Sequence, residues 1–270
     1  MTTILSPDEV QWGKNRIEAL LSGLNERILG QEELTRRVVV ACLARGNVLL
    51  EGLPGLGKTE LVKGLAGLLG LDFRRIQFTP DLLPSDITGA GVLEEVDGRR
   101  EMRFVQGPIF GNLILADEIN RASPRTQSAM LEAMQEQRVS VMGDTYELPD
   151  PFWCMATQNP IDMEGTYPLP EAQLDRFLFK LHVTQVSGAV MSQIIQSRRR
   201  GRAPEPTPVL QRGELEQLFG LVERVFLPTE VAEALGRLVE YTHPSTSPVK
   251  KVQDYVRYGA SPRAAIGLAE

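Results

Sequence analysis

The sequence predicts an α/β fold in which helices flank a parallel sheet, followed by a small all-helical domain. Short apolar runs at 47–51, 113–116 and 152–156 have the length of buried strands, and helix-like stretches alternate with them. Strands that alternate with helices form a parallel sheet covered on both faces. After a proline-rich linker near 204–208 the pattern is helical only, so a second unit is expected there.

The first two helices can be located by their ends. Ser6-Pro7-Asp8-Glu9 places a serine at the N-cap, a proline at the first helical position and a glutamate at N3, which predicts a helix to about Leu24. A second helix is expected over about 31–44. The strand at 47–51 then leads into a glycine-rich loop and a helix over 58–69.

Later elements follow from periodicity and turn residues, and several of them form two hairpins. The expected elements are a strand at 73–78, a hairpin of 91–95 and 100–104 turning at Asp97-Gly98, a strand at 113–116, a helix over 123–136, a hairpin over 139–148 turning at Gly143-Asp144, strands at 152–156 and 177–183, and helices over 212–225 and 229–242. The expected organisation is a helix at 1–25 packing on the core, a main domain at 26–187 with hairpin insertions near 85–104 and 138–149, a connecting helix and linker at 188–210, and a helical lid at 211–270.

Composition restricts the class of protein. The chain has 270 residues, 42% of them hydrophobic, and its net charge is 29 − 35 = −6. An acidic chain argues against nucleic acid as the main partner, and the basic run 198–202 is interpreted as a solvated end of the linker. Cys42 and Cys154 lie in apolar runs, as small buried side chains in a reducing compartment do. No apolar stretch is long enough to span a membrane and no signal peptide is visible, so a cytoplasmic protein is expected.

Residues 52–59 fit the phosphate-binding pattern G-x-x-x-x-G-K-[ST]. Glycines allow the backbone to approach phosphate oxygens, and the N–H groups at the start of the following helix favour an anion. Lys58 is expected to reach the β- and γ-phosphates, and the Thr59 hydroxyl to bind Mg²⁺. The alternative interpretation is a glycine-rich turn before a helix. The expected nucleotide-binding set is Gly52, Pro54, Gly55, Leu56, Gly57, Lys58, Thr59 and Glu60.

Polar side chains follow two of the predicted strands. Asp117 and Glu118 end the strand at 113–116, where acids lie beside a phosphate loop in an open α/β sheet. We expect Asp117 to hold Mg²⁺ and Glu118 to polarise the attacking water. Asn159 follows another strand and can bind the γ-phosphate or the water. The alternatives are an acidic helix N-terminus and an Asn-Pro turn.

Four segments together resemble the MoxR family of AAA+ ATPases. They are Asp117-Glu118-Ile119-Asn120-Arg121-Ala122, Ala156-Thr157-Gln158-Asn159-Pro160, the run from Gly165-Thr166-Tyr167-Pro168 to Leu174-Asp175-Arg176-Phe177, and Gly259-Ala260-Ser261-Pro262-Arg263-Ala264. They occur in the family's order, and the resemblance covers roughly residues 25–270.

The resemblance implies an ATP-driven ring, usually of six subunits, with a nucleotide at each subunit boundary. It implies that Asn159 is the sensor-1 residue, that Arg176 is the arginine finger for the neighbouring subunit, and that Arg263 is sensor 2 on a lid over its own nucleotide. Gln31 matches the segment near the adenine. The two hairpins match the insertions of the helix-2-insert branch. For both arginines the alternative interpretation is a salt bridge at a helix end. Gln77 could hold Glu118 in an inactive pose.

The function implied by the resemblance is ATP hydrolysis with Mg²⁺ that remodels, matures or activates a client protein. Proteins with a von Willebrand factor A domain are the implied partner class. The alternatives are an ATP-dependent switch that barely hydrolyses, a related DNA-directed motor, or a metabolite kinase, which would need neither Arg176 nor Arg263. Family members usually continue beyond the sensor-2 motif, so the lid is expected to be truncated at Glu270.

Overall fold

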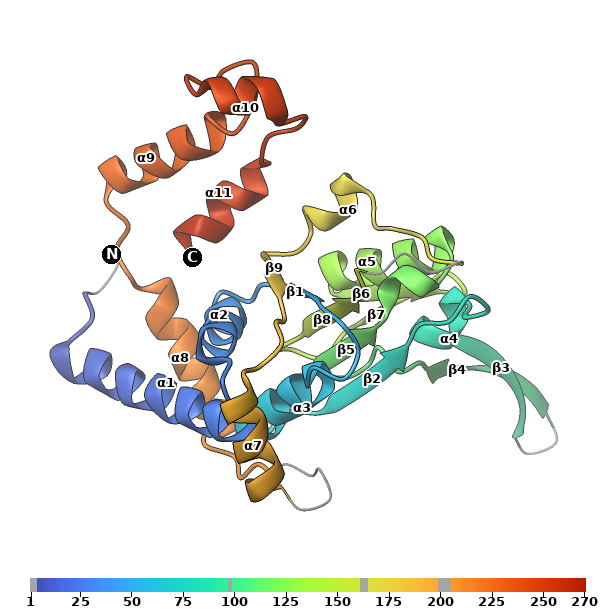
Figure 1. The fold of residues 1–270 in the computed structure, drawn as a ribbon. Coiled ribbons are helices and arrows are strands. Elements are labelled where there is room, and N and C mark those ends of the chain that lie inside the picture. Colours follow the sequence, from blue (N-terminus) through green and yellow to red (C-terminus); the bar gives the residue numbers. More distant parts are fainter. Residues whose placement is uncertain (1–3, 97–98, 161–164, 199–204) are drawn as a thin grey trace.

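A five-stranded parallel sheet lies at the centre of the computed structural model, which describes residues 4–96, 99–160, 165–198 and 205–270 (Figure 1). The strand order is β2-β5-β8-β1-β9. The strands are β1 (Val48–Glu51), β2 (Phe73–Gln77), β5 (Leu113–Asp117), β8 (Trp153–Gln158) and β9 (Phe179–His182). Their parallel pairing confirms the predicted α/β architecture.

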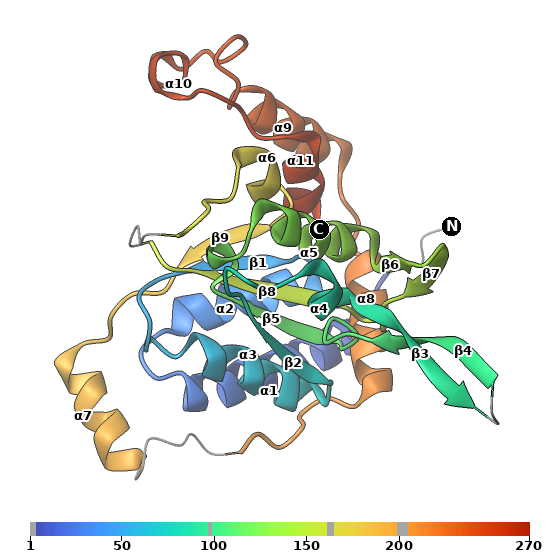
Figure 2. The same cartoon turned by 90° about the vertical axis from the view of Figure 1, so that its right-hand side faces the viewer.

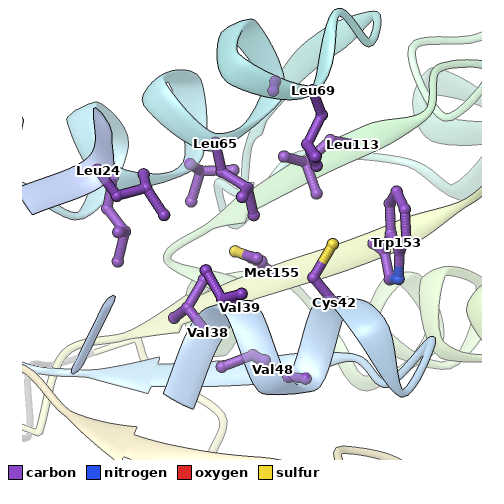
Figure 3. Packing of buried hydrophobic residues seen from close by; sticks show 14 of the residues in the cluster. Leu24, Val38, Val39, Cys42, Val48, Leu65, Leu69, Leu113, Trp153 and Met155 are labelled. Atoms are coloured by element: carbon purple, nitrogen blue, oxygen red, sulfur yellow. The ribbon is translucent and has the colours of Figure 1, made fainter. Parts of the chain in front are cut away.

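Both faces of the sheet are buried, and successive residues of each central strand alternate between two apolar clusters. In β1, Val48 and Leu50 join one cluster and Leu49 joins the other. The same alternation divides Trp153 from Cys154 in β8. Figure 3 shows the first cluster, in which side chains of the sheet meet those of the helices on one face. A strand buried on both faces reads as a continuous apolar run, which is why the sequence identifies it.

Helices α1 (Pro7–Arg27), α2 (Glu32–Leu43) and α3 (Lys58–Leu69) supply the first cluster. The predicted capping box is present: the Glu9 N–H donates to Ser6 Oγ at 3.2 Å and the Ser6 N–H donates to Glu9 Oε2 at 2.7 Å. Helices α4 (Pro84–Thr88) and α5 (Pro124–Glu136) cover the opposite face. Two single-turn elements, η1 (Ile119–Arg121) and α6 (Glu171–Leu174), follow β5 and precede β9.

Two antiparallel hairpins are inserted beside the sheet, as predicted. They are formed by β3 (Gly89–Val96) with β4 (Arg99–Gln106) and by β6 (Arg138–Val141) with β7 (Asp144–Glu147). The first projects from the body (Figure 2). The rings of Phe104 and Tyr146 stack with centroids 4.1 Å apart, which joins the hairpins at their base.

The second hairpin turns one residue earlier than predicted, at Met142-Gly143 instead of Gly143-Asp144. Both turn residues have positive φ, 58° for Met142 and 94° for Gly143. A two-residue turn of this kind places glycine second, with a less suited residue first, so the glycine alone did not fix the register. The turn predicted at Asp97-Gly98 lies outside the described residues.

The C-terminal helices divide differently from the expected boundary at 211. Helix α8 (Arg212–Glu223) buries Leu215, Leu218 and Phe219 in the first cluster and therefore belongs to the body. Only α9 (Thr229–Glu240), α10 (Lys250–Tyr255) and α11 (Pro262–Ala269) form the separate lid. Periodicity shows that a helix has an apolar face but not which neighbour covers it. Helix α7 (Gly188–Ser197) follows β9, as the expected connecting helix does.

Leu178, immediately before β9, packs against the lid. A Cβ atom added at Gly267 of α11 would lie 2.4 Å from Leu178 Cδ1. One added at Gly46, before β1, would lie 2.4 Å from Leu178 Cδ2. The Leu178 N–H also donates to the Asn47 carbonyl oxygen at 2.8 Å. Leu178 is therefore held between the start of the sheet and the lid.

Both cysteines are free and buried, as the sequence predicted. Burial raises the pKa of the Cys42 and Cys154 thiols to about 12, so both stay protonated and unreactive at neutral pH. Within the described ranges, no helix combines the length and apolarity that crossing a bilayer requires.

Candidate functional site

The glycine-rich loop connects β1 to α3 and leaves an open cradle. Gly55 and Gly57 have φ values of 83° and 84°, and a Cβ at either would meet nothing within 4 Å. Gly57 is the N-cap of α3 and no side chain caps that helix end. Lys58 Nζ donates to the Gly52 carbonyl oxygen at 2.6 Å, which folds the lysine back across the loop. A cradle of this shape fits phosphate oxygens.

Lys58 lies between opposing electrostatic influences. Partial burial lowers the pKa of its ammonium group, while the charges of Asp117 and Glu118 raise it. Burial is the larger effect, so the pKa of Lys58 lies below the ordinary lysine value of 10.5. Bound phosphate would add negative charge beside the ammonium and favour its charged form.

The two acids at the end of β5 are held by Thr157 of the neighbouring strand β8. Thr157 Oγ1 donates to Asp117 Oδ1 at 2.6 Å and accepts from the Glu118 N–H at 2.8 Å. Thr157 is fully buried. Glu118 has a φ of 58°, a left-handed conformation that bulky residues rarely adopt and that often marks a functional position. These contacts fix where the two carboxylates point.

Each carboxylate is also paired with an arginine. Arg75 of β2 donates to Asp117 Oδ2 from Nε at 2.9 Å and from Nη2 at 2.6 Å. Arg121 of η1 donates to Glu118 Oε2 at 2.9 Å. Gln77 Nε2 donates to the same Glu118 oxygen at 3.1 Å, which places Gln77 where the hypothesis of an inactive pose requires it.

A cavity of about 420 Å³ joins these groups, and Asn159 also lines it. The residues that line the cavity are Pro54, Gly55, Lys58, Arg75, Gln77, Asp117, Glu118, Arg121 and Asn159. In the part of the chain that the structure describes, no cluster of three or more His, Cys, Asp or Glu side chains could hold a metal alone. Magnesium usually takes one or two protein oxygens plus phosphate oxygens and water, so the Thr59 hydroxyl and the Asp117 carboxylate fit it.

Gln31 lies in a neighbouring hollow of about 280 Å³, which His182 and Thr184 also line. Gln31 Nε2 donates to the Thr184 carbonyl oxygen at 3.4 Å. His182 pairs with Glu51 in the sheet, and Glu51 directly precedes the phosphate loop. The hollow therefore lies at the same edge of the sheet as the cradle.

Arg176 and Arg263 lie at the opposite edge of the sheet. Both line a cavity of about 410 Å³ with Asn47, which precedes β1, and Phe179, which begins β9. Arg263 Nη1 lies 3.4 Å from Asp175 Oδ2. Arg176 Nε is buried and has no hydrogen-bond partner among the described residues. Asp175 thus pairs with the arginine of the lid. Arg263 is not among the residues lining the phosphate cavity.

Sequence reasoning located most of the site and missed three of its members. The structure brings Lys58, Asp117, Glu118 and Asn159 to one cavity, with the loop residues around it. The residues missed are Arg75, Arg121 and Thr157. Arg75 could have been found, because it is two residues before Gln77 and side chains two apart on a strand share a face.

This geometry defines a class of protein. A glycine-rich cradle follows β1, and two acids end β5, which is separated from β1 by β8 alone. A helical lid follows the sheet. This combination is the geometry of an AAA+ nucleotide-binding domain. The profile of the ATPase family associated with various cellular activities (AAA) matches residues 47–179.

Similar proteins narrow the class to a family. The chain is 45% identical to the uncharacterised protein YeaC of Bacillus subtilis over 91% of this chain and 74% of the relative. It is 43% identical to chaperone MoxR1 of Mycobacterium tuberculosis over 93% of this chain and 66% of that protein. A solved structure of a provisionally assigned ATPase from Cytophaga hutchinsonii superposes with a TM-score of 0.86 and 37% identity, covering 97% of this chain and 79% of that one. The chain belongs to the MoxR family of AAA+ ATPases.

Proposed function

We propose that this protein hydrolyses ATP at the boundary between adjacent subunits of a ring, each active site being built from two opposite edges of the fold. The observation that carries the proposal is the separation of charges. The phosphate cavity contains Lys58, Asp117 and Glu118, while Arg176 and Arg263 lie together at the other edge of the sheet. Because the two sets of charges line different cavities of one subunit, the arginines would serve the nucleotide of a neighbouring subunit.

The phosphate edge would bind and position the nucleotide. The cradle would hold phosphate oxygens through backbone N–H groups, and Lys58 would turn from the Gly52 carbonyl oxygen to the β- and γ-phosphates. Thr59 and Asp117 would hold Mg²⁺, which supplies charge neutralisation on the phosphates when bound. Gln31 would lie near the adenine, in the hollow beside β9.

Glu118 would orient and polarise the attacking water, with Asn159 beside it. In this structure the Glu118 carboxylate accepts from Gln77 and Arg121. Both donors contact the same carboxylate oxygen, Glu118 Oε2, so that oxygen is occupied by the chain's own side chains. Glu118 would therefore need to leave these donors before it acts, which agrees with the inactive pose hypothesised for Gln77.

The opposite edge would complete the neighbour's site. Arg176 is partly exposed and its Nε has no hydrogen-bond partner among the described residues, so its guanidinium is not tied down by those contacts in its own subunit. A guanidinium supplied across an interface commonly contributes about 10³–10⁵ in rate. Arg263 lies on the same face through Asp175, so we assign it to the neighbour's nucleotide and not to its own.

The use of this hydrolysis would be client remodelling by a ring of six subunits. Chaperone MoxR1 is a relative whose name describes a chaperone. The projecting hairpin β3–β4 exposes Leu93 and Met102, which supplies apolar surface for a protein client. A von Willebrand factor A domain partner and a cytoplasmic location stay predictions.

Mixed rings test the proposal. Arg176→Ala subunits keep an intact phosphate edge and Glu118→Gln subunits keep an intact arginine edge, so mixing two inactive preparations should restore part of the ATPase activity. The matched control mixes Arg176→Ala subunits with the double variant Glu118→Gln/Arg176→Ala, in which no intact pair can form. Equal activity in the two mixtures, with mixed rings demonstrated by native mass spectrometry, would contradict a shared site.

A further inference from the structure

The Asp117 carboxylate is already fully engaged by the protein's own side chains. Its Oδ1 accepts from buried Thr157 at 2.6 Å. Its Oδ2 accepts two hydrogen bonds from Arg75, at 2.9 and 2.6 Å. Its second oxygen is therefore covered by a guanidinium and is not free to bind a cation.

Arg75 is suited to being displaced. Its side chain is 48% exposed, whereas that of Asp117 is 13% exposed. An ion pair with one partner in solvent contributes little stability, because water screens the attraction and the long side chain loses freedom. Thr157, in contrast, is fully buried, so water does not compete for its hydrogen bond to Asp117 Oδ1. The two contacts to Asp117 therefore differ in strength, and the weaker one covers Oδ2.

Release of Arg75 would also loosen Glu118. Arg75 Nη2 donates to Gln77 Oε1, and Gln77 Nε2 donates to Glu118 Oε2. Arg75 and Gln77 lie two residues apart on β2, which pairs with β5 in parallel, and Gln77 is opposite Asp117 in that register. Arg75 thus connects both acids of the proposed site, because it contacts Asp117 directly and Glu118 through Gln77.

From these contacts we infer that Arg75 is a positioning residue that holds Asp117 in place of the divalent cation, so that Arg75 must release Asp117 when nucleotide binds with Mg²⁺. The inference rests on the proposed function. It makes a quantitative demand: Arg75 and the cation compete for Asp117, and removing Arg75 should lower the Mg²⁺ concentration that nucleotide binding requires.

The experiment measures binding of a fluorescent ADP analogue to the full chain while Mg²⁺ is titrated. Arg75→Gln should lower the half-saturating Mg²⁺ concentration by about twofold to fivefold, the size expected for loss of a partly exposed ion pair. Arg75→Lys, which keeps the charge without the bidentate fork, should give a smaller decrease. The matched control is Arg74→Gln, which removes the same charge from the next residue of β2. Arg74 pairs with Asp72 and not with Asp117, so its half-saturating concentration should stay that of the wild type.

A double-variant cycle separates competition from other effects. In an Asp117→Asn background, Arg75→Gln should no longer change the Mg²⁺ dependence, because the group being contested is gone. An unchanged or higher Mg²⁺ requirement in Arg75→Gln would overturn the inference. So would equal weakening of analogue binding with and without Mg²⁺, which would make Arg75 a phosphate ligand. If the wild type bound no analogue at any Mg²⁺ concentration, the proposed function would fail and the inference with it.

Discussion

The charged groups at the two edges of the sheet differ in how fully they are paired within the chain. At the carboxyl edge, Asp117 and Glu118 are each held by several donors of the same chain. At the amino edge, Arg176 has a buried Nε without a described partner and Arg263 makes one long contact, 3.4 Å, with Asp175. Charges that are fully paired within one chain can be stable in an isolated subunit. Charges that are incompletely paired indicate a partner, and we propose that this partner is the carboxyl edge of another copy.

The largest effects should come from removing one group at each edge. Lys58→Ala should weaken binding of a fluorescent nucleotide by about tenfold to hundredfold, since a hydrogen bond to a charged group is lost. Arg176→Ala should leave that affinity unchanged but lower ATP turnover in assembled protein by about 10³–10⁵. Fluorescence titration and a phosphate-release assay measure the two quantities. Weakened nucleotide binding in an isolated Arg176→Ala subunit would break the comparison.

A smaller effect is expected for the lid arginine. Arg263→Ala should lower turnover in assembled protein by about tenfold to hundredfold, through loss of one charged hydrogen bond in the transition state. The affinity of isolated subunits for nucleotide should not change, because Arg263 does not line their phosphate cavity. Asp175→Asn serves as the control that removes the pair but keeps the guanidinium. Reduced affinity in dilute, unassembled Arg263→Ala protein would return Arg263 to its own nucleotide.

Thr157→Val tests the comparison of the two edges through the free energy of unfolding. Valine has a similar shape to threonine but lacks the buried hydroxyl, so Asp117 Oδ1 and the Glu118 N–H lose the hydrogen bonds that this hydroxyl makes. Unfolding free energy should fall by about 1–3 kcal/mol, the usual cost of unsatisfied buried groups. Urea denaturation measures it. Arg176→Ala is the comparison variant, and it should lose less stability because its Nε makes no described hydrogen bond.

The smallest effect should appear in the pH dependence of nucleotide binding. Burial lowers the pKa of Lys58 below 10.5. As pH rises through that lowered value, Lys58 loses its proton and the positive charge that attracts phosphate, so affinity should decrease before an ordinary lysine would titrate. Lys58→Arg should abolish the decrease, because arginine stays protonated throughout. Titrations between about pH 7 and 10 check the sign. Arginines at the other edge should add no such dependence.

The sequence predicted the site residues that belong to a local motif or a strand end better than those whose roles depend on a neighbouring strand. Lys58 could be located from the glycine-rich pattern, and Asp117 and Asn159 could be located because they end or follow a strand whose apolar run is visible. Arg75 and Thr157 were missed, since their roles come from strand neighbours in space, β2 beside β5 and β5 beside β8. The same reason explains α8: its apolar stripe is visible in the sequence, but its packing on the body depends on tertiary contact.

Leu178 connects the lid to the start of the sheet. Its side chain fills the space between Gly46 and Gly267, and it lies two residues after Arg176. A rotation of α11 would therefore displace Leu178, which belongs to the same short segment as Arg176. We expect the tilt of the lid and the position of Arg176 to change together.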